Sequence, residues 1–395
     1  EEVSMYNLRK KNDCLIEYYL PFLLLLSQYK FGPISLGEIG LMLLVLIKLS
    51  RDGFLLVRSK NNSLTLLMLY VMTRMLMNAF FQKTGYQVVL HNILQYSFMW
   101  FATVYLTNKE FDEDKLYKSW KIAGVIFSAG LVYQLVLLFV VGRGVKPIPI
   151  IPGYVLRGDE VSSRPSSFFA EPAAFVCAML PLVFMALKRQ DFSWAVVATL
   201  ASVASTSTVG IILTAVLWVQ TFFQGEQKIG KRVAYLLVAG VGLWTIVNLS
   251  VFSSSLGKLS DVINGDSTVG ARILCGLDTV RTMNLFEWIF GTAYNDSSSY
   301  IYEHLYRIPL TSPVHRYMNA KGAIFMNTLC MVIFHYGLVG LWLYWEAVYS
   351  RLAKKGYEAK PYLIMMLVSI LGQGKFLNSV FFMELILILL YGTKK

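Results

Sequence analysis

The segment SSRPSSFFAEP brings a cation, two aromatic rings and a carboxylate together: Arg164, Phe168, Phe169 and Glu171. Arginine is the side chain best suited to phosphate, because its planar, permanently charged fork matches two oxygens at once. The Glu171-Pro172 pair is typical of the first turn of a helix. The residue types therefore predict a site for a phosphate with a sugar attached. In the alternative interpretation, Glu171 only stabilises the helix N-terminus and Arg164 only reaches toward water from the edge of a bilayer.

The composition indicates the surroundings of this segment. Of the 395 residues, 56% are hydrophobic and 15% are charged, and the mean hydropathy is +0.54. A soluble globular chain has about 45–50% apolar and roughly 25% charged residues. This excludes a typical soluble enzyme, a disordered chain and a disulfide-stapled secreted module.

Apolar runs of about 20 residues are long enough to cross a bilayer core of ~30 Å. They predict an all-α polytopic membrane protein with about twelve transmembrane helices in a single domain, 1–395. The predicted spans are 14–30, 34–50, 62–82, 86–107, 118–142, 168–188, 191–204, 206–224, 232–252, 321–347, 360–373 and 376–392. A loop over 143–167 and a large loop over 253–320, between the ninth and tenth helices, lie on one side.

The positive charges indicate which side that is. With both termini in the cytoplasm, 22 of the 36 Lys and Arg residues are cytoplasmic, 13 are outside, and Arg74 lies within a span. Short cytoplasmic loops carry such an excess in membrane proteins. The net charge of +12 is thus explained mostly by topology, and no nucleic-acid partner is expected.

Ten of the 13 outer cations are concentrated in the two long outer loops, against the topological bias. They are Arg143, Lys146, Arg157, Arg164, Lys258, Arg272, Arg281, Arg307, Arg316 and Lys321. One interpretation is that long loops escape the charge rule. The other is that these side chains bind an anion.

The cysteines and the start of the chain give no sign of a disulfide framework, a metal site or a secretion signal. The cysteines Cys14, Cys177, Cys275 and Cys330 are too widely spaced for a disulfide framework or a zinc site, and no metal is expected. No cleavable signal peptide is visible, and Met5 is expected to be the native first residue.

The run Ser205–Gly210 is either a tight turn or an unwound stretch that lines a cavity. Polar residues within spans are costly and often functional; here they are Arg74, His91, Gln134 and Glu384.

Four segments in this order carry a resemblance to a known family: RPSSFFAEPAAF, STSTVG, STVGARILCGLDTV with WIFGTAYND, and FMNTLCMVIFHYGLVGLW. Over about residues 34–350 the chain resembles the O-antigen polymerases (Wzy-type), which are related to the O-antigen ligases. The resemblance implies a multi-pass protein of the bacterial inner (plasma) membrane with a large periplasmic or extracellular loop. It implies a glycosyltransferase that uses glycans on undecaprenyl pyrophosphate, with no cofactor and with a possible chain-length regulator as partner.

The resemblance also assigns residues. It implies catalytic roles for Arg164 and Arg272. Arg281, nine residues beyond Arg272, falls on the opposite face of the same predicted helix. The ligase branch places a His before the Asn that opens the tenth span, whereas Met326 precedes Asn327 here. This departure favours polymerase over ligase; His335 is expected to pack within the span, and His315 is the other nearby histidine.

The expected mechanism follows from these residues. Arg164 and Arg272 neutralise the departing diphosphate of one lipid-linked unit while a hydroxyl of another attacks. Glu171 is the first choice of base, ahead of Asp159 and Asp266, because an apolar interface disfavours the charged carboxylate. Further substrate contacts are expected from Arg143, Arg157, Arg281, Arg316, His315 and Tyr294. Tyr300, Tyr302, Tyr306 and Tyr317 either stack on sugars or pack the loop.

Three other functions stay open at this point. A transporter or flippase of lipid-linked glycan would fit the many spans, but the long outer loop and the lack of evident paired broken helices weigh against it. A ligase would transfer glycan to lipid A core or to a protein. A receptor or scaffold would be expected to have an exposed soluble domain.

Overall fold

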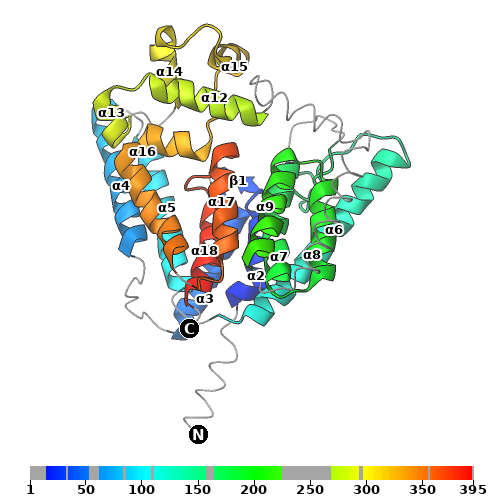
Figure 1. Ribbon diagram of the computed structural model, residues 1–395. Coiled ribbons are helices and arrows are strands. Elements are labelled where there is room, and N and C mark those ends of the chain that lie inside the picture. The colour runs from blue at the N-terminus through cyan, green and yellow to red at the C-terminus, as the bar shows by residue number, and fades with distance from the viewer. Residues whose placement is uncertain are drawn as a thin grey trace. The chain divides into compact units, whose positions relative to one another are not determined.

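The computed structural model describes residues 15–32, 34–52, 62–82, 86–107, 111–156, 164–224, 268–292, 297–354 and 356–393, and these residues are mostly helical (Figure 1). This confirms the predicted helical class. Within the described residues, three helices, Asn62–Phe80, Glu113–Phe139 and Thr328–Ala353, are long and apolar enough to cross a membrane, and six shorter apolar helices accompany them. The number of twelve spans stays a prediction, and the predicted span 232–252 lies outside the described residues.

The chain divides into two compact units. The first unit comprises 1–53 and 111–259, and the second comprises 54–110 and 260–395. Each unit is thus built from two separate stretches of sequence. The prediction of a single domain over 1–395 is not decided by this division, and each unit is described by itself.

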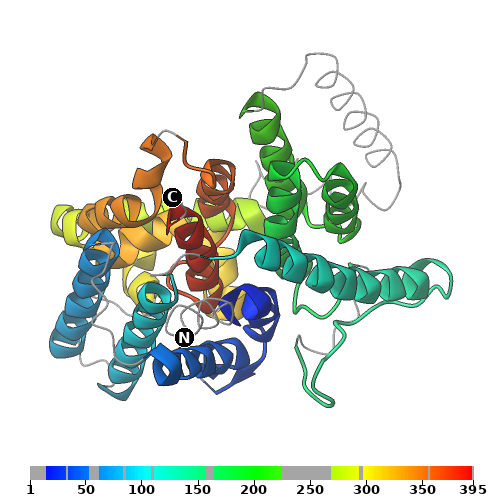
Figure 2. The same ribbon diagram turned by 90° about the horizontal axis from the view of Figure 1, so that it is seen from below.

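The first unit is organised around α7 (Pro172–Lys188), whose residues from Phe175 to Leu187 are all buried. It contacts α2 (Leu15–Leu26), α6 (Glu113–Phe139), α8 (Phe192–Ala204) and α9 (Thr208–Gln224), as Figures 1 and 2 show. Glycines make the close approaches possible. A Cβ on Gly124 of α6 would lie 2.5 Å from Leu182, and one on Gly210 of α9 would lie 2.6 Å from Val176.

A small hairpin between α2 and α3 (Leu36–Asp52) was not predicted. Helix α2 ends at Leu26 instead of continuing to residue 30, and β1 (Lys30–Phe31) pairs antiparallel with β2 (Ile34–Ser35). The Ser35 N–H donates to Glu38 Oε2 at 2.8 Å, and the Glu38 N–H donates to Ser35 Oγ at 3.2 Å. This reciprocal pairing is a capping box, and it sets the start of α3.

The second unit contains the helices α4 (Asn62–Gln82), α5 (Tyr86–Leu106), α16 (Thr328–Tyr344), α17 (Lys360–Gly372) and α18 (Ser379–Thr393). The prediction that a helix begins at residue 321 was wrong. Gly322, at φ +61°, ends the preceding helix, and the Asn327 side chain caps α16 by accepting from the Cys330 N–H at 2.8 Å. After Tyr344 the chain continues as a π-helical turn, Trp345–Tyr349, and a 3₁₀ turn, Ser350–Ala353.

The predicted large outer loop is folded over its described part. It forms α12 (Thr268–Arg281), α13 (Leu285–Phe290), α14 (Ser297–His304), the 3₁₀ turn Leu305–Arg307 and α15 (Pro313–Lys321). Figure 1 shows α12, α14 and α15 together at one end of the second unit. Their apolar side chains share a buried cluster with the start of α16, which includes Cys275, Tyr300, Ile308, Val314, Met318, Cys330 and Phe334. The loop is therefore fixed to α16 by its own core.

Helix α16 is broken at Gly337, whose φ of +65° and ψ of −167° are not helical. The break lies against the end of α13, where Gly291 has φ +86°. A Cβ on Gly337 would overlap the Ile289 carbonyl oxygen, and one on Gly291 would overlap that of His335. Two backbones thus cross here at a separation that only glycine permits.

This crossing predicts that Gly337→Ala destabilises the protein more than an alanine at a second left-handed glycine. Gly322→Ala is the matched control, because its φ is +61° but nothing lies within 4 Å of the added Cβ. Both variants carry backbone strain, and only Gly337→Ala adds a backbone clash. We expect Gly337→Ala to lose roughly 1–3 kcal/mol more than the control, which is the usual cost of overpacking. Thermal unfolding of both variants in detergent measures this, and equal losses would show that the crossing is not tight.

Candidate functional site

A buried glutamine holds the turn that carries Arg164. Gln134 of α6 is 1% exposed, and its Oε1 accepts from the backbone N–H groups of Ser166 and Ser167 at 2.8 and 2.7 Å. Its Nε2 donates to the carbonyls of Lys146 and Ser167 at 2.7 and 3.3 Å. One side chain therefore satisfies four backbone contacts of an irregular segment that has no ladder of its own.

The rest of the turn is packed just as closely. Ser167 is held at φ +56°, and its hydroxyl donates to the Phe127 carbonyl at 2.7 Å. The Phe169 ring is buried edge-on against Phe127 and Phe175, with ring centroids 5.1 and 5.9 Å away. Of the expected aromatic wall, Phe169 thus belongs to the core. The turn is a rigid support for the residues on either side of it.

Arg164 reaches a second turn, the one between α8 and α9. Its Nη2 donates to the Thr206 carbonyl at 3.1 Å. Ser205, Thr206 and Ser207 are all buried, and Thr206 has φ +57°. The polar run of the sequence is thus a tight turn, and two segments of the family resemblance, RPSSFFAEP and STSTVG, contact each other.

Two helices begin beside this contact. Gly210, the third residue of α9, packs on Val176, the fifth residue of α7, so that both N-termini lie at the same end of the unit. A helix N-terminus carries a partial positive charge and unpaired N–H groups. Arg164 therefore adds a full positive charge to an end of the unit where the backbone already favours anions.

Glu171 is the N-cap residue of α7, which begins at Pro172 and not at residue 168 as predicted. Its backbone carbonyl accepts from the N–H groups of Ala174 and Phe175 at 3.0 and 3.1 Å, while its side chain makes no capping bond. The side chain is exposed. The described residues therefore do not supply the apolar surroundings that were expected for this carboxylate.

In the second unit Arg272 contacts the turn between α17 and α18. It is half-buried on α12, and its Nη1 donates to the Gly372 carbonyl at 3.4 Å. The turn is fastened to the start of α16: the Thr328 N–H and hydroxyl both donate to the Gln373 carbonyl, at 2.7 and 2.6 Å. Arg272 therefore lies beside a fixed turn, as Arg164 does in the first unit.

The same turn carries Lys375, one of the three expected outer cations that lie outside the two long loops. Lys375 Nζ pairs with Glu384 Oε1 of α18 at 3.0 Å, and the two side chains are 16% and 3% exposed. The Lys375 N–H donates to Thr328 Oγ1 at 2.9 Å. The buried Glu384 thus serves as the counter-ion of a lysine three residues from the carbonyl that Arg272 contacts. In the sequence, the only signal for this ion pair is that Glu384 follows Lys375 by nine residues.

Two more of the cations that were expected outside, Arg281 and Arg316, lie on the second unit and are exposed. Arg281 is 74% exposed and pairs with Asp278 at 3.3 Å, unlike the half-buried Arg272. Arg316 is exposed, with its guanidinium 5.5 Å from the Tyr317 ring. His315 Nε2 donates to the Ile308 carbonyl at 3.1 Å and so helps to hold the loop.

The other described residues that were predicted to contact substrate are exposed. Arg143 is exposed just beyond α6, and its N–H donates to the Leu137 carbonyl at 3.1 Å. Tyr302 and Tyr306 are 79% and 76% exposed. Arg157, Asp159, Asp266 and Tyr294 lie outside the described residues.

Tyr300 belongs to the loop core. It is 0% exposed, and its ring is stacked on His304 at 4.2 Å and edge-on to Phe334 at 5.1 Å. Burial, together with the nearby Glu287 carboxylate, raises the pKa of Tyr300 to about 12. The packing interpretation therefore holds for this tyrosine, and sugar stacking does not.

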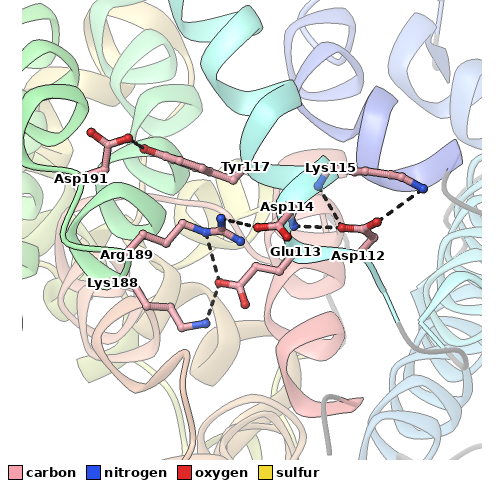
Figure 3. A network of polar contacts seen from close by, with 8 residues as sticks. All are labelled: Asp112, Glu113, Asp114, Lys115, Tyr117, Lys188, Arg189 and Asp191. Atoms are coloured by element: carbon pink, nitrogen blue, oxygen red, sulfur yellow. Dashed lines mark hydrogen bonds and ion pairs between the residues drawn. The ribbon is translucent and has the colours of Figure 1, made fainter.

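At the other end of α6 and α7 from the Arg164 turn lies a network of ion pairs (Figure 3). Lys188 contacts Glu113 at 2.7 Å, Arg189 contacts Asp114 at 2.5 Å, and Tyr117 donates to Asp191 at 2.8 Å. The acidic residues begin α6 and the basic residues end α7, so both groups complement the helix dipoles. This network joins two helix ends on the side predicted to be cytoplasmic.

Arg164 and Glu171 belong to the first unit, and Arg272 and Lys375 belong to the second. No protein-family model matches this chain, and no curated protein matches it significantly.

The Gln134 contacts predict a large loss of stability when the amide is removed. Gln134→Leu keeps the side-chain volume but leaves the buried N–H groups of Ser166 and Ser167 without their acceptor. Each such group costs about 1–3 kcal/mol. Tyr133→Leu, at a 57% exposed neighbour, is the control and should unfold at the parent temperature. The test is the melting temperature of each variant in detergent. An unchanged melting temperature for Gln134→Leu would show that the turn does not depend on this side chain.

Proposed function

We propose that this protein is a polysaccharide polymerase that acts at the outer face of the bacterial inner membrane. It transfers an oligosaccharide from undecaprenyl pyrophosphate to a hydroxyl of another lipid-linked repeat unit. The bond between the anomeric carbon and the phosphate oxygen breaks, and undecaprenyl pyrophosphate leaves with the electron pair. A bond from the acceptor oxygen to the anomeric carbon forms, and the hydroxyl proton passes to a base.

The observation that carries this proposal is the placement of Arg164. It stands on a rigid turn, contacts a second buried turn, and lies at the end of the unit where α7 and α9 begin. Fixed donors aimed at developing charge are the strongest general source of catalysis, because they need no reorganisation during the reaction. A diphosphate is already a good leaving group, so that charge neutralisation by such donors matters more than its protonation.

Arg272 of the second unit is proposed as a further phosphate-binding side chain, with Lys375 of the adjoining turn as an additional cation. The exposed Arg143, Arg281 and Arg316 are available to the glycan or the phosphates, and Glu171 is proposed to accept the proton. An exposed carboxylate suits this task once substrate and lipid exclude water from it. The proposed partners are the lipid-linked donor and acceptor, membrane lipids and a possible chain-length regulator.

The arginine assignment predicts that Arg164→Lys and Arg272→Lys abolish polymer formation. Lysine keeps the charge but loses the planar fork that binds two phosphate oxygens. The assay incubates purified protein with a lipid-linked repeat unit, without nucleotide sugar or metal, and separates the products by length. Arg189→Lys, the same change at the opposite end of α7, is the control and should leave the ladder intact.

The outcomes also separate the competing functions. A ladder from both lysine variants would contradict the arginine assignment. No ladder from the parent protein, with glycan moved across vesicles instead, would indicate a flippase. Transfer of single units to lipid A core, without chain growth, would indicate a ligase.

The proposed orientation predicts opposite labelling at the two ends of α6. Arg143→Cys should react with a membrane-impermeant maleimide added to intact spheroplasts, because the loop after α6 is outside. Asp114→Cys, at a side chain that is 84% exposed, should react only after lysis. The parent protein, in which Cys177, Cys275 and Cys330 are buried, gives the background. The reverse pattern would invert the topology and remove the arginines from the outer face.

A further inference from the structure

Helix α13 belongs to the large loop that the charge pattern places outside the membrane, yet it packs along transmembrane candidates. It contacts α16, and its last turn is bonded to α4. Tyr70 of α4 donates through its hydroxyl to the carbonyl of Phe290 at 3.1 Å. Arg74, one turn further along α4, donates through Nη2 to the carbonyls of Gly291 and Thr292 at 2.9 and 3.4 Å.

These contacts place the end of α13 well below the end of α4. Arg74 and Tyr70 precede the last residue of α4, Gln82, by eight and twelve positions. At 1.5 Å per residue these intervals correspond to ~12 and ~18 Å along the helix. One side chain spans only part of such a distance, so the carbonyls of Phe290 and Gly291 lie beside the body of α4 and not beyond its end.

The contacts with α16 give the same depth. The Thr292 N–H donates to the carbonyl of Phe334, the seventh residue of α16, at 2.7 Å. Tyr70 also donates to the carbonyl of Tyr336 at 3.0 Å, so that one hydroxyl serves both sides of the glycine crossing. Irregular backbone within a bilayer must have its polar groups paired by protein, and this segment meets that demand at Phe290, Gly291, Thr292, Phe334 and Tyr336.

The two faces of α13 differ in character. Trp288 packs inward on the core of the loop, and Glu287 is engaged in a capping box with Asn284. The other face is apolar and uncovered: Leu285, Phe286, Ile289 and Phe290 are 77%, 63%, 36% and 37% exposed. The last residue of α13 is bonded to α4, which itself exposes the apolar side chains Leu66, Leu69, Leu76 and Phe80.

We propose that α13 is a re-entrant helix whose apolar face, Leu285, Phe286, Ile289 and Phe290, is covered by acyl chains of the outer leaflet. Its depth beside α4, the paired backbone at its end and the continuity with the apolar surface of α4 favour hydrocarbon over water or a protein partner. The large loop is then seated in the membrane by α13 and not suspended above it. This inference rests on α4 being a membrane span and does not depend on the glycan chemistry.

The test measures the surroundings of a fluorescent label at Phe286→Cys. The full-length protein, labelled with an NBD maleimide, is reconstituted into phosphatidylcholine nanodiscs, with or without bromine on the acyl chains. We expect a blue-shifted emission, at least two-fold quenching by brominated lipid and little quenching by iodide. Leu285→Cys, at a 77% exposed side chain, provides a second position if the first variant does not fold.

Two control positions make the outcomes distinct. Leu69→Cys, on the exposed face of α4, should be quenched by brominated lipid, whereas Leu310→Cys, 88% exposed in the same loop as α13, should be quenched by iodide. A label on α13 that behaves like the one at Leu310, while Leu69 is lipid-quenched, would overturn the re-entrant helix alone. If Leu69 were also quenched by iodide only, the membrane assignment of α4 would fail with it.

Discussion

The structure depends on one constraint: wherever a helix ends or breaks within apolar surroundings, its backbone polar groups need partners from the protein. The cost of leaving them unpaired is several kcal/mol each in hydrocarbon. Three polar side chains meet this need at three places. Gln134 supports the turn before α7, Arg74 supports the glycine crossing, and Thr328 supports the turn between α17 and α18.

These supports change how the polar residues of the predicted spans are interpreted. Such residues are functional candidates by default because burying them is expensive. Gln134 and Arg74 make backbone contacts that hold turns, and Glu384 balances Lys375. Arg164, in the segment before α7, and Arg272, in the first half of α12, are then the better candidates for substrate. Arg164 donates to the Thr206 carbonyl and Arg272 donates to the Gly372 carbonyl, and these bonds help to orient the two guanidinium groups.

The helices were largely predictable because long apolar runs have few other stable states. Their limits were not, because caps decide them: Ser35 and Glu38 start α3, and Asn327 starts α16 six residues after Lys321. Of the candidate site, the sequence predicted that Glu171 lies at the start of a helix and that Arg272 and Arg281 share one helix. It could not show that Arg164 contacts Thr206, or that Gly291 meets Gly337, because no local pattern records which turns come together in space.

The central claim is that arginines on the outer face assist the departure of a polyprenyl diphosphate, and counting that product tests it most directly. Purified protein is supplied with a lipid-linked repeat unit, and the undecaprenyl pyrophosphate released is quantified beside the glycosidic bonds formed. The account predicts one molecule of the diphosphate for each new linkage, and none from Arg164→Lys protein that remains folded. Glycan linkages without released diphosphate, or undiminished release from that variant, would contradict it.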